Sequence, residues 1–210
     1  MSLSSTLEQD AIDAREKELF GKPPRIGLLG DNELGPDAAK TIADVREVMR
    51  LPQTGGIPDF FRMLLKHPAL FRAQMDIGIM IVSPNAAIPR REAELAILRL
   101  AWLTRAPFEW GEHVGIGKKF GLTDDEVEWI TEGSTAAGWP DHERAIMKGV
   151  EELLDDTYLT DATWAALART WNEAQMLEFP VLVGLYLMTA MQQNSVRLPL
   201  MPGNTGMNKR

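Results

Sequence analysis

Apolar residues recur every three or four positions along most of this chain, which is the spacing of a helix that buries one face. In the first part of the chain, this pattern predicts a weakly amphipathic helix over 7–20 and further helices over 37–49, 59–65 and 69–82. Prolines and glycines between the first two helices predict an extended connector. A second break, LPQTGGIPD, ends the helix over 37–49.

Helix-start signals are denser in the rest of the chain. Pro89 and Pro107 each occupy a position typical of a first-turn proline, so a helix is expected to begin at each. The helix after Pro89 is apolar on almost every side between 93 and 103, which places it in the core. Capping residues or acidic first turns mark further helix starts at Thr123, Asp141, Thr160 or Asp161, and Asn172. No β-alternation of useful length occurs, so the sequence predicts an all-α fold.

The composition indicates one domain over 1–210. A chain of 210 residues with 45% hydrophobic content can bury a sizeable core without disulfides or metals. Its 22 basic and 30 acidic side chains give a net charge of −8, which opposes binding to nucleic acid and to anionic membranes. There is no cysteine, which excludes thiolate nucleophiles, dithiol redox chemistry and Cys-ligated zinc.

The sequence predicts neither a targeting segment nor a membrane span. The N-terminal residues are charged from Glu8 onward and lack the apolar core of a signal peptide, so a cytoplasmic location is expected. The longest apolar run, 179–191, contains Pro180 and is shorter than the roughly 20 residues that cross a bilayer. We expect this run to form a buried helix.

Two acids and a histidine stand close together in the stretch PFEWGEHVGIGKKFGL. On a helix, Glu109 and His113 share one face because they are four residues apart, and Glu112 is expected on a neighbouring, solvated face. The simplest interpretation is an acidic first turn with a weak surface ion pair. A metal site is disfavoured, because a catalytic zinc needs three protein ligands and only Glu94 offers a third.

Glu94 is anomalous, because it lies within the most apolar helix of the chain. A buried carboxylate must find a donor or stay protonated. One interpretation is a salt bridge to a nearby arginine, such as Arg90, Arg91 or Arg99. The other is a contact with His113 across a helical hairpin, which would assemble a buried Glu–His–Glu set suited to proton transfer.

Two stretches of the sequence resemble the carboxymuconolactone decarboxylase family. They are REAELAILRLAWLTRAPFEWGEHVGIGKKFGLTDDEV and, after it, DHERAIMKGVEELLDDTYLTDATWAAL. The resemblance covers roughly 57–199 and leaves 1–56 as an extension and 200–210 as a tail. It implies the helical fold shared with alkylhydroperoxidase D.

The peroxidase branch of this fold has a glutamate, two cysteines and a histidine at fixed spacing. On this chain the glutamate falls on Glu94 and the histidine on His113, but the cysteine positions fall on Ala106 and Glu109. Neither residue can supply a thiolate, so a peroxidase function inferred from the family alone has no chemical support.

The decarboxylase-like branch implies a cofactor-independent lyase that removes carbon dioxide from a small carboxylated, lactone-like substrate. In this hypothesis His113 protonates the resulting dienolate, Glu94 orients His113, and Glu109 positions the substrate. Arg105 is expected to hold the substrate carboxylate. Trp110 is a candidate to line the pocket, together with Trp102 and Trp171, although large aromatic residues more often belong simply to the core. No cofactor and no metal are expected.

The resemblance also implies a homo-oligomer, either a trimer or a hexamer. The last helix supports this, because its apolar surface is wider than a monomer needs to bury. The alternative function is a non-catalytic oligomeric helical protein that binds a small ligand. The two hypotheses differ in one structural expectation: an enzyme requires Glu94, Glu109 and His113 to converge in a shielded site.

Overall fold

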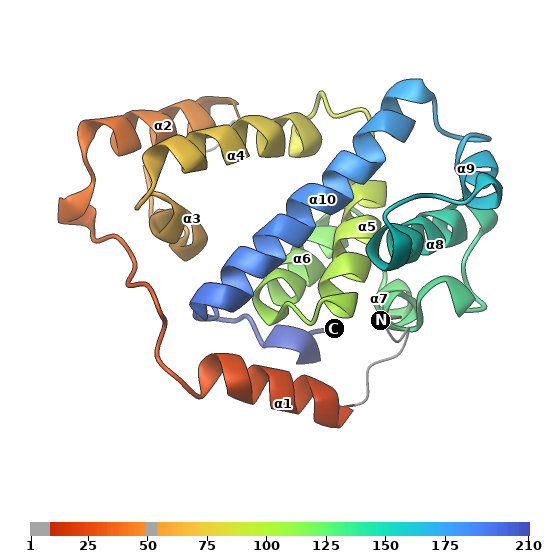
Figure 1. Ribbon diagram of the computed structural model, residues 1–210, viewed down its shortest axis with the longest axis horizontal. Helices are drawn as coiled ribbons and strands as arrows, with labels where there is room; N and C mark the ends of the chain where they lie inside the picture. Colours follow the sequence, from red (N-terminus) through yellow and green to blue (C-terminus); the bar gives the residue numbers. More distant parts are fainter. Residues whose placement is uncertain (1–8, 49–53) are drawn as a thin grey trace.

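A computed structural model of the chain describes residues 9–48 and 54–210 (Figure 1). Every regular element in these two ranges is helical, which confirms the all-α prediction. The α-helices are α1 (Gln9–Phe20), α2 (Pro36–Val48), α3 (Asp59–Leu64), α4 (Pro68–Val82), α5 (Arg90–Leu103), α6 (Pro107–Lys119), α7 (Asp124–Glu132), α8 (Asp141–Asp156), α9 (Asp161–Leu167) and α10 (Glu173–Val196). Short 3-10 turns are η1 (Asp31–Glu33), η2 (Gly133–Thr135) and η3 (Gly206–Asn208). The predicted helices over 7–20 and 37–49 extend beyond the described residues at 7–8 and 49.

Most helix starts lie where the sequence places them. Thr123 caps α7, Thr160 caps α9 and Asn172 caps α10, each through a side-chain oxygen that accepts a backbone N–H. Pro107 is the first residue of α6, as predicted. Pro89, in contrast, precedes α5 as its N-cap residue, so the prediction of a first-turn position was off by one residue.

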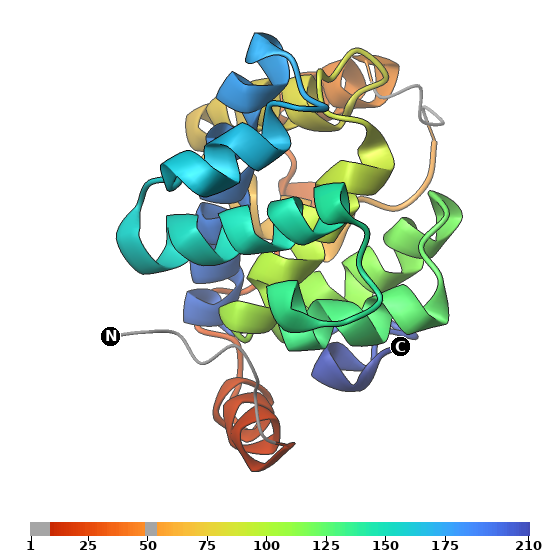
Figure 2. The same ribbon diagram turned by 90° about the vertical axis from the view of Figure 1, so that its right-hand side faces the viewer.

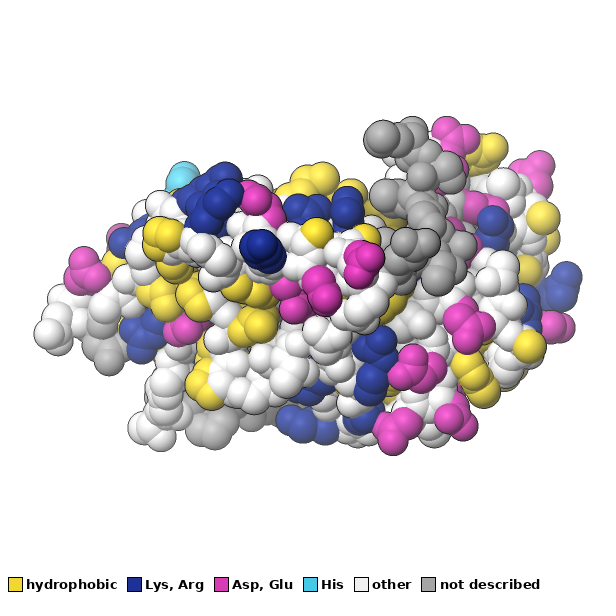
Figure 3. All heavy atoms as spheres, turned by 90° about the horizontal axis from the view of Figure 1, so that it is seen from below, with side chains coloured by type: hydrophobic (Ala, Val, Ile, Leu, Met, Phe, Trp, Pro, Cys, Tyr) yellow, Lys and Arg dark blue, Asp and Glu magenta, His cyan; other side chains and the backbone are white. Residues whose placement is uncertain are grey.

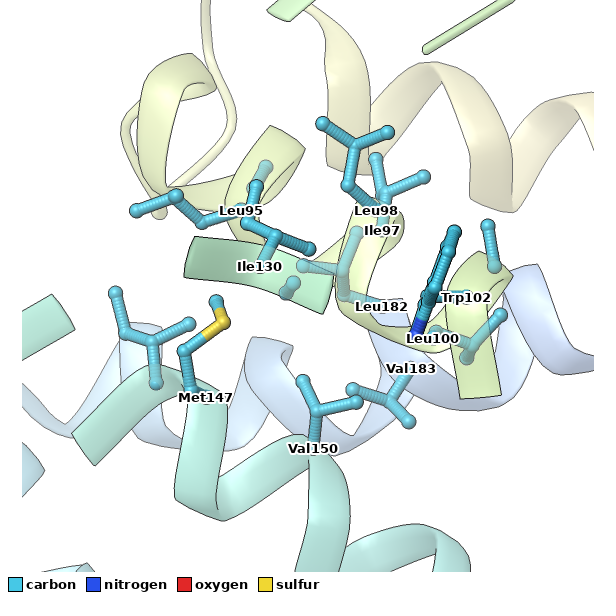
Figure 4. Packing of buried hydrophobic residues seen from close by; sticks show 14 of the residues in the cluster. Leu95, Ile97, Leu98, Leu100, Trp102, Ile130, Met147, Val150, Leu182 and Val183 are labelled. Atoms are coloured by element: carbon cyan, nitrogen blue, oxygen red, sulfur yellow. The ribbon is translucent and has the colours of Figure 1, made fainter. Parts of the chain in front are cut away.

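Helix α5 lies at the centre of the bundle and packs against α6, α7, α8 and α10. All its residues from Ala93 to Leu103 are buried, as the apolar pattern predicts. Figure 4 shows side chains of α5, including Leu98 and Leu100, together with labelled side chains of α7, α8 and α10 in this buried cluster. Both leucines are fully buried, and each contributes roughly 1.5–3 kcal/mol to stability through this burial.

Helix α10 runs diagonally across the bundle in Figure 1 and contacts α4, α5, α6 and α8. Its length and hydropathy would by themselves suit a membrane span, but the same properties occur in a core helix of a soluble bundle. Pro180 lies inside the helix without ending it. One face of α10 is buried, as predicted, whereas another face is exposed at Leu177 and Met191.

The residues before α4 form two separate structures. Helix α1 packs near the C-terminal turn η3, where Glu16 accepts a 2.8 Å hydrogen bond from the backbone N–H of Met207. Figures 1 and 2 both show α1 on the side of the molecule opposite α2 and α4. Helix α2 contributes Ala38, Ile42 and Val45 to a second hydrophobic cluster with α3 and α4.

Charged side chains of both signs are interspersed on the face of the molecule that carries α1 (Figure 3). Several of them form ion pairs within this region, such as Lys22 with Glu18 at 2.8 Å. The described residues of this face therefore form no extended surface of a single charge.

Candidate active site

The α5–α6 hairpin brings Glu94 and His113 together. Glu94 is completely buried, and its Oε2 lies 2.8 Å from Nδ1 of His113. Its other oxygen, Oε1, lies 2.6 Å from Nη2 of Arg90, one helical turn earlier on α5. The contact with His113 and the salt bridge to an arginine, which the sequence left as alternatives, are therefore both present.

Glu109 faces the same region but has no such partners. Its side chain is 1% exposed, and neither carboxyl oxygen has a hydrogen-bond partner among the described residues. Burial, and secondly the negative charge of Glu94, raise the pKa of Glu109 well above its ordinary value. The environment therefore favours the protonated form of Glu109 more than water does. His113 is paired with Glu94 through Nδ1, and no ion pair is found between His113 and Glu109.

Tyr186 of α10 completes this group of side chains, and sequence analysis did not assign it a role. Its ring meets the His113 ring edge-on, with 5.2 Å between the centroids. Burial, and then the charge of Glu94, raise the pKa of the Tyr186 hydroxyl. The only signal in the sequence is a hydroxyl-bearing ring within an otherwise apolar stretch of α10.

Glu109, His113 and Tyr186 line a pocket of about 400 Å³. Its polar side carries Arg90, Glu109, Glu112, His113 and Tyr186. The apolar side includes Val45 of α2, Phe60 and Phe61 of α3, Met75 and Ile79 of α4, and Leu185 of α10. The volume is within the range of pockets that hold small organic ligands.

A second polar group lines the pocket along α10. Thr189 and Gln193 follow Tyr186 at helical spacing, and Gln74 of α4 joins them. Nε2 of Gln74 lies 3.3 Å from the Thr189 hydroxyl, whereas Oε1 of Gln193 is buried and has no hydrogen-bond partner in the part of the chain that the structure describes. Uncharged hydrogen-bonding groups are thus available in addition to the ionisable ones.

Two predicted substrate-binding residues do not line the pocket. Arg105 lies in the turn between α5 and α6 with φ +50°, and its backbone oxygen accepts a 3.4 Å bond from Asn194. Trp110 is fully buried, packs against Trp102 at 4.9 Å and donates a hydrogen bond to the backbone of Lys209. Each helix residue turns about 100° from the previous one, so Trp110 points into the core while Glu109 faces the pocket. Arg90 is the arginine found at the pocket.

Residues 68–151 match the carboxymuconolactone decarboxylase family. The matched range contains Arg90, Glu94, Glu109 and His113, with the spacing that suggested the resemblance. Residues 68–151 form a carboxymuconolactone decarboxylase family domain. Helices α2, α3 and α10, which supply other walls of the pocket, lie outside the matched range.

Solved structures place this domain in the alkylhydroperoxidase D-like fold. A peroxidase-related protein from Ralstonia eutropha JMP134 is 14% identical, with a TM-score of 0.71 over 86% of this chain and 94% of that one. A putative antioxidant defence protein from Agrobacterium tumefaciens is 16% identical, with a TM-score of 0.60 over 66% of this chain and 94% of that one. At these identities the similarity shows the fold alone.

A different activity is represented among the similar structures. A cysteine-to-alanine variant of the debrominase Bmp8, solved with 2,3,4-tribromopyrrole, is 15% identical, with a TM-score of 0.65 over 87% of this chain and 96% of that one. A comparison with curated protein sequences finds no match.

Proposed function

We propose that this protein is a cofactor-independent lyase that decarboxylates a small carboxylated substrate and protonates the resulting carbanion. The observation that carries this proposal is the position of Glu109: its buried carboxyl group lines a pocket beside the Glu94–His113 pair and has no hydrogen-bond partner among the described residues. Burial raises the pKa of Glu109, and we propose that it is protonated at neutral pH. A neutral carboxyl group can donate a proton, whereas an ionised one cannot.

The reaction requires one bond to break and one to form. The bond between the substrate carbon and its carboxylate breaks, carbon dioxide leaves, and the electron pair remains on the substrate as an enolate. Glu109 then transfers its proton to the carbon of this enolate and becomes a carboxylate. The sequence favoured His113 as this donor, but His113 already bonds Glu94 through Nδ1. We propose that His113 then transfers a proton from solvent to the Glu109 carboxylate, which restores its protonated form.

Arg90 replaces Arg105 as the residue proposed to bind the substrate carboxylate. It lines the pocket, and its Nε is buried without a hydrogen-bond partner in the described part of the chain. An arginine can bind two carboxylates at once, because its donors point in different directions. Glu94 holds Nη2 and thereby orients the guanidinium, which leaves Nε for the substrate.

Carbon dioxide release tests this proposal directly. The substrates are 4-carboxymuconolactone and an analogue in which an alkyl group replaces its side-chain carboxylate. We expect the purified protein to release carbon dioxide from at least one of them, and Glu109→Gln to lower the rate by about 100-fold or more. Glu132→Gln, an exposed acid-to-amide change on α7, is the matched control and leaves the rate unchanged.

Two outcomes would count against this function. Carbon dioxide release no faster than spontaneous decay would favour the non-catalytic ligand-binding role. Release that is equally fast in the wild type and in Glu109→Gln would exclude Glu109 as the proton donor.

A further inference from the structure

We propose that the pocket selects a substrate with a single carboxylate and a mainly apolar body, and that α2 and α3 supply the selecting wall. This inference rests on the proposed function, because it takes the carboxylate to be bound beside Glu109. It adds a class of substrate to the proposed function, and it assigns the selection of that substrate to helices outside residues 68–151.

The part of the pocket lining that α2 and α3 contribute is apolar. Val45 of α2 and Phe60 and Phe61 of α3 line the pocket from the segment before residue 68. Met75 and Ile79 of α4 continue the same surface. A substrate extending from Arg90 toward this wall would exchange water for aromatic and aliphatic contacts, which favours a hydrocarbon body over a charged one.

This wall is held firmly in place. Val45 is 5% exposed and packs in one cluster with Phe71 of α4 and Phe108 of α6. The guanidinium of Arg62 on α3 donates hydrogen bonds to the backbone oxygens of Ile57 at 3.1 Å and Leu29 at 2.9 Å. Val45 is thus packed against α4 and α6, and the hydrogen bonds of Arg62 join α3 to the residues that precede it.

The charges around the pocket allow one carboxylate but oppose a second. Arg90 is the sole arginine or lysine among the described residues that line it, and Arg90 is already paired with Glu94. Glu112 also lines the pocket, and the donor that it contacts is the neutral amide of Asn204, at 2.8 Å. A dicarboxylate would therefore place its second charge near Glu112, against the aromatic wall or beside the uncharged side chains of α4 and α10, in each case without a cation to neutralise it.

Binding of two stable probes tests this inference separately from catalysis. The probes are 4-butylbenzoate and 4-(3-carboxypropyl)benzoate, which have similar length and differ by one terminal carboxylate. Isothermal titration calorimetry is performed on the full-length protein at pH 7. We expect 4-butylbenzoate to bind at least about tenfold more tightly than the dicarboxylate.

Two variants assign this preference to particular residues. Phe60→Ala should weaken 4-butylbenzoate binding by about fivefold, whereas Ile77→Ala, an exposed change on α4 outside the pocket, should not. Glu112→Gln retains an oxygen that can accept from Asn204, and should strengthen dicarboxylate binding by about threefold. This gain is informative even if Phe60→Ala fails to fold.

The inference is overturned if the dicarboxylate binds as tightly as 4-butylbenzoate, if neither probe binds, or if neither variant changes affinity as stated. Because the probes are not decarboxylated, the expected binding result would stand even if no carbon dioxide release were found. The converse result is carbon dioxide release without a preference for the monocarboxylate probe. It would support the proposed function and refute the proposed class of substrate.

Discussion

Glu94 and His113 form a 2.8 Å hydrogen bond across the α5–α6 hairpin, although they are 19 residues apart in the chain. This bond, together with the 2.6 Å contact between Glu94 and Arg90, accounts for a completely buried carboxylate at the centre of the bundle. Glu109 lies one helical turn before His113 on α6, and it receives no comparable support. Two buried glutamates on facing helices therefore differ in their partners: Glu94 is bound by His113 and Arg90, whereas neither oxygen of Glu109 has a hydrogen-bond partner among the described residues.

The first prediction concerns the pH dependence of stability. Because the folded state raises the pKa of Glu109 above its ordinary value of 4.5, it binds this proton more tightly than the unfolded state does. The associated stabilisation is present below the unfolded pKa and is lost as pH rises through the folded pKa. Glu109→Gln cannot lose a proton at this position, so this loss of stability is absent from the variant. The Tm of the variant minus the Tm of the wild type should therefore increase as pH is raised from about 4.5 to 8. Thermal melts across this pH range, with Glu132→Gln as a flat control, measure the effect.

A second prediction concerns the hydrogen bond to the buried anion. His113→Ala removes one of the two partners of Glu94 and should destabilise the protein by about 1.5–3 kcal/mol at pH 7. Urea unfolding followed by circular dichroism gives this free energy. A loss below about 0.5 kcal/mol would mean that the bond contributes little to the fold.

The third prediction distinguishes Arg90 from Arg105. Arg105→Ala should leave 4-butylbenzoate affinity within about twofold of wild type, because Arg105 does not line the pocket. Arg90→Gln should lower this affinity by about tenfold or more, because it removes a charged donor to the carboxylate. A larger loss of affinity in Arg105→Ala than in Arg90→Gln would mean that the carboxylate binds near Arg105, and would contradict its assignment to Arg90.

A fourth prediction concerns assembly. The exposed face of α10 carries Leu177, Val181, Met188 and Met191, with exposed fractions between 37% and 71%. We expect this apolar face to contact a second copy of the chain in a homo-oligomer. Light scattering coupled to size-exclusion chromatography should show more than one 23.4 kDa subunit, and Leu177→Glu should reduce the measured mass. A monomeric wild type would refute this expectation.

The sequence predicts the helices well because their signals are local. Thr123, Thr160 and Asn172 cap the helices that they were expected to cap, since capping depends on a few adjacent residues. The burial of α5 likewise follows from an apolar pattern that covers nearly its whole circumference. The helices that could be predicted are therefore those whose ends and faces are specified within one short segment.

The pocket was predicted less completely, because it depends on contacts between distant segments. Glu94 and His113 were identified because a buried acid requires a donor, and the structure brings them together. Arg105 was expected to hold the substrate carboxylate, but it does not line the pocket, and the sequence does not give the direction of its side chain. The contributions of Tyr186 and Phe60 depend on how α10 and α3 pack against α6, which spacing along the chain does not reveal.

The central claim is that Glu109 is protonated at neutral pH, and infrared spectroscopy tests it most directly. The measurement compares the carbonyl stretch of protonated carboxyl groups in the wild type, Glu109→Gln and Glu112→Gln at pH 7. We predict a protonated-carboxyl band in the wild type that is lost in Glu109→Gln and retained in Glu112→Gln. Its absence from the wild type at pH 7 would show that Glu109 is ionised, and would contradict its role as the proton donor.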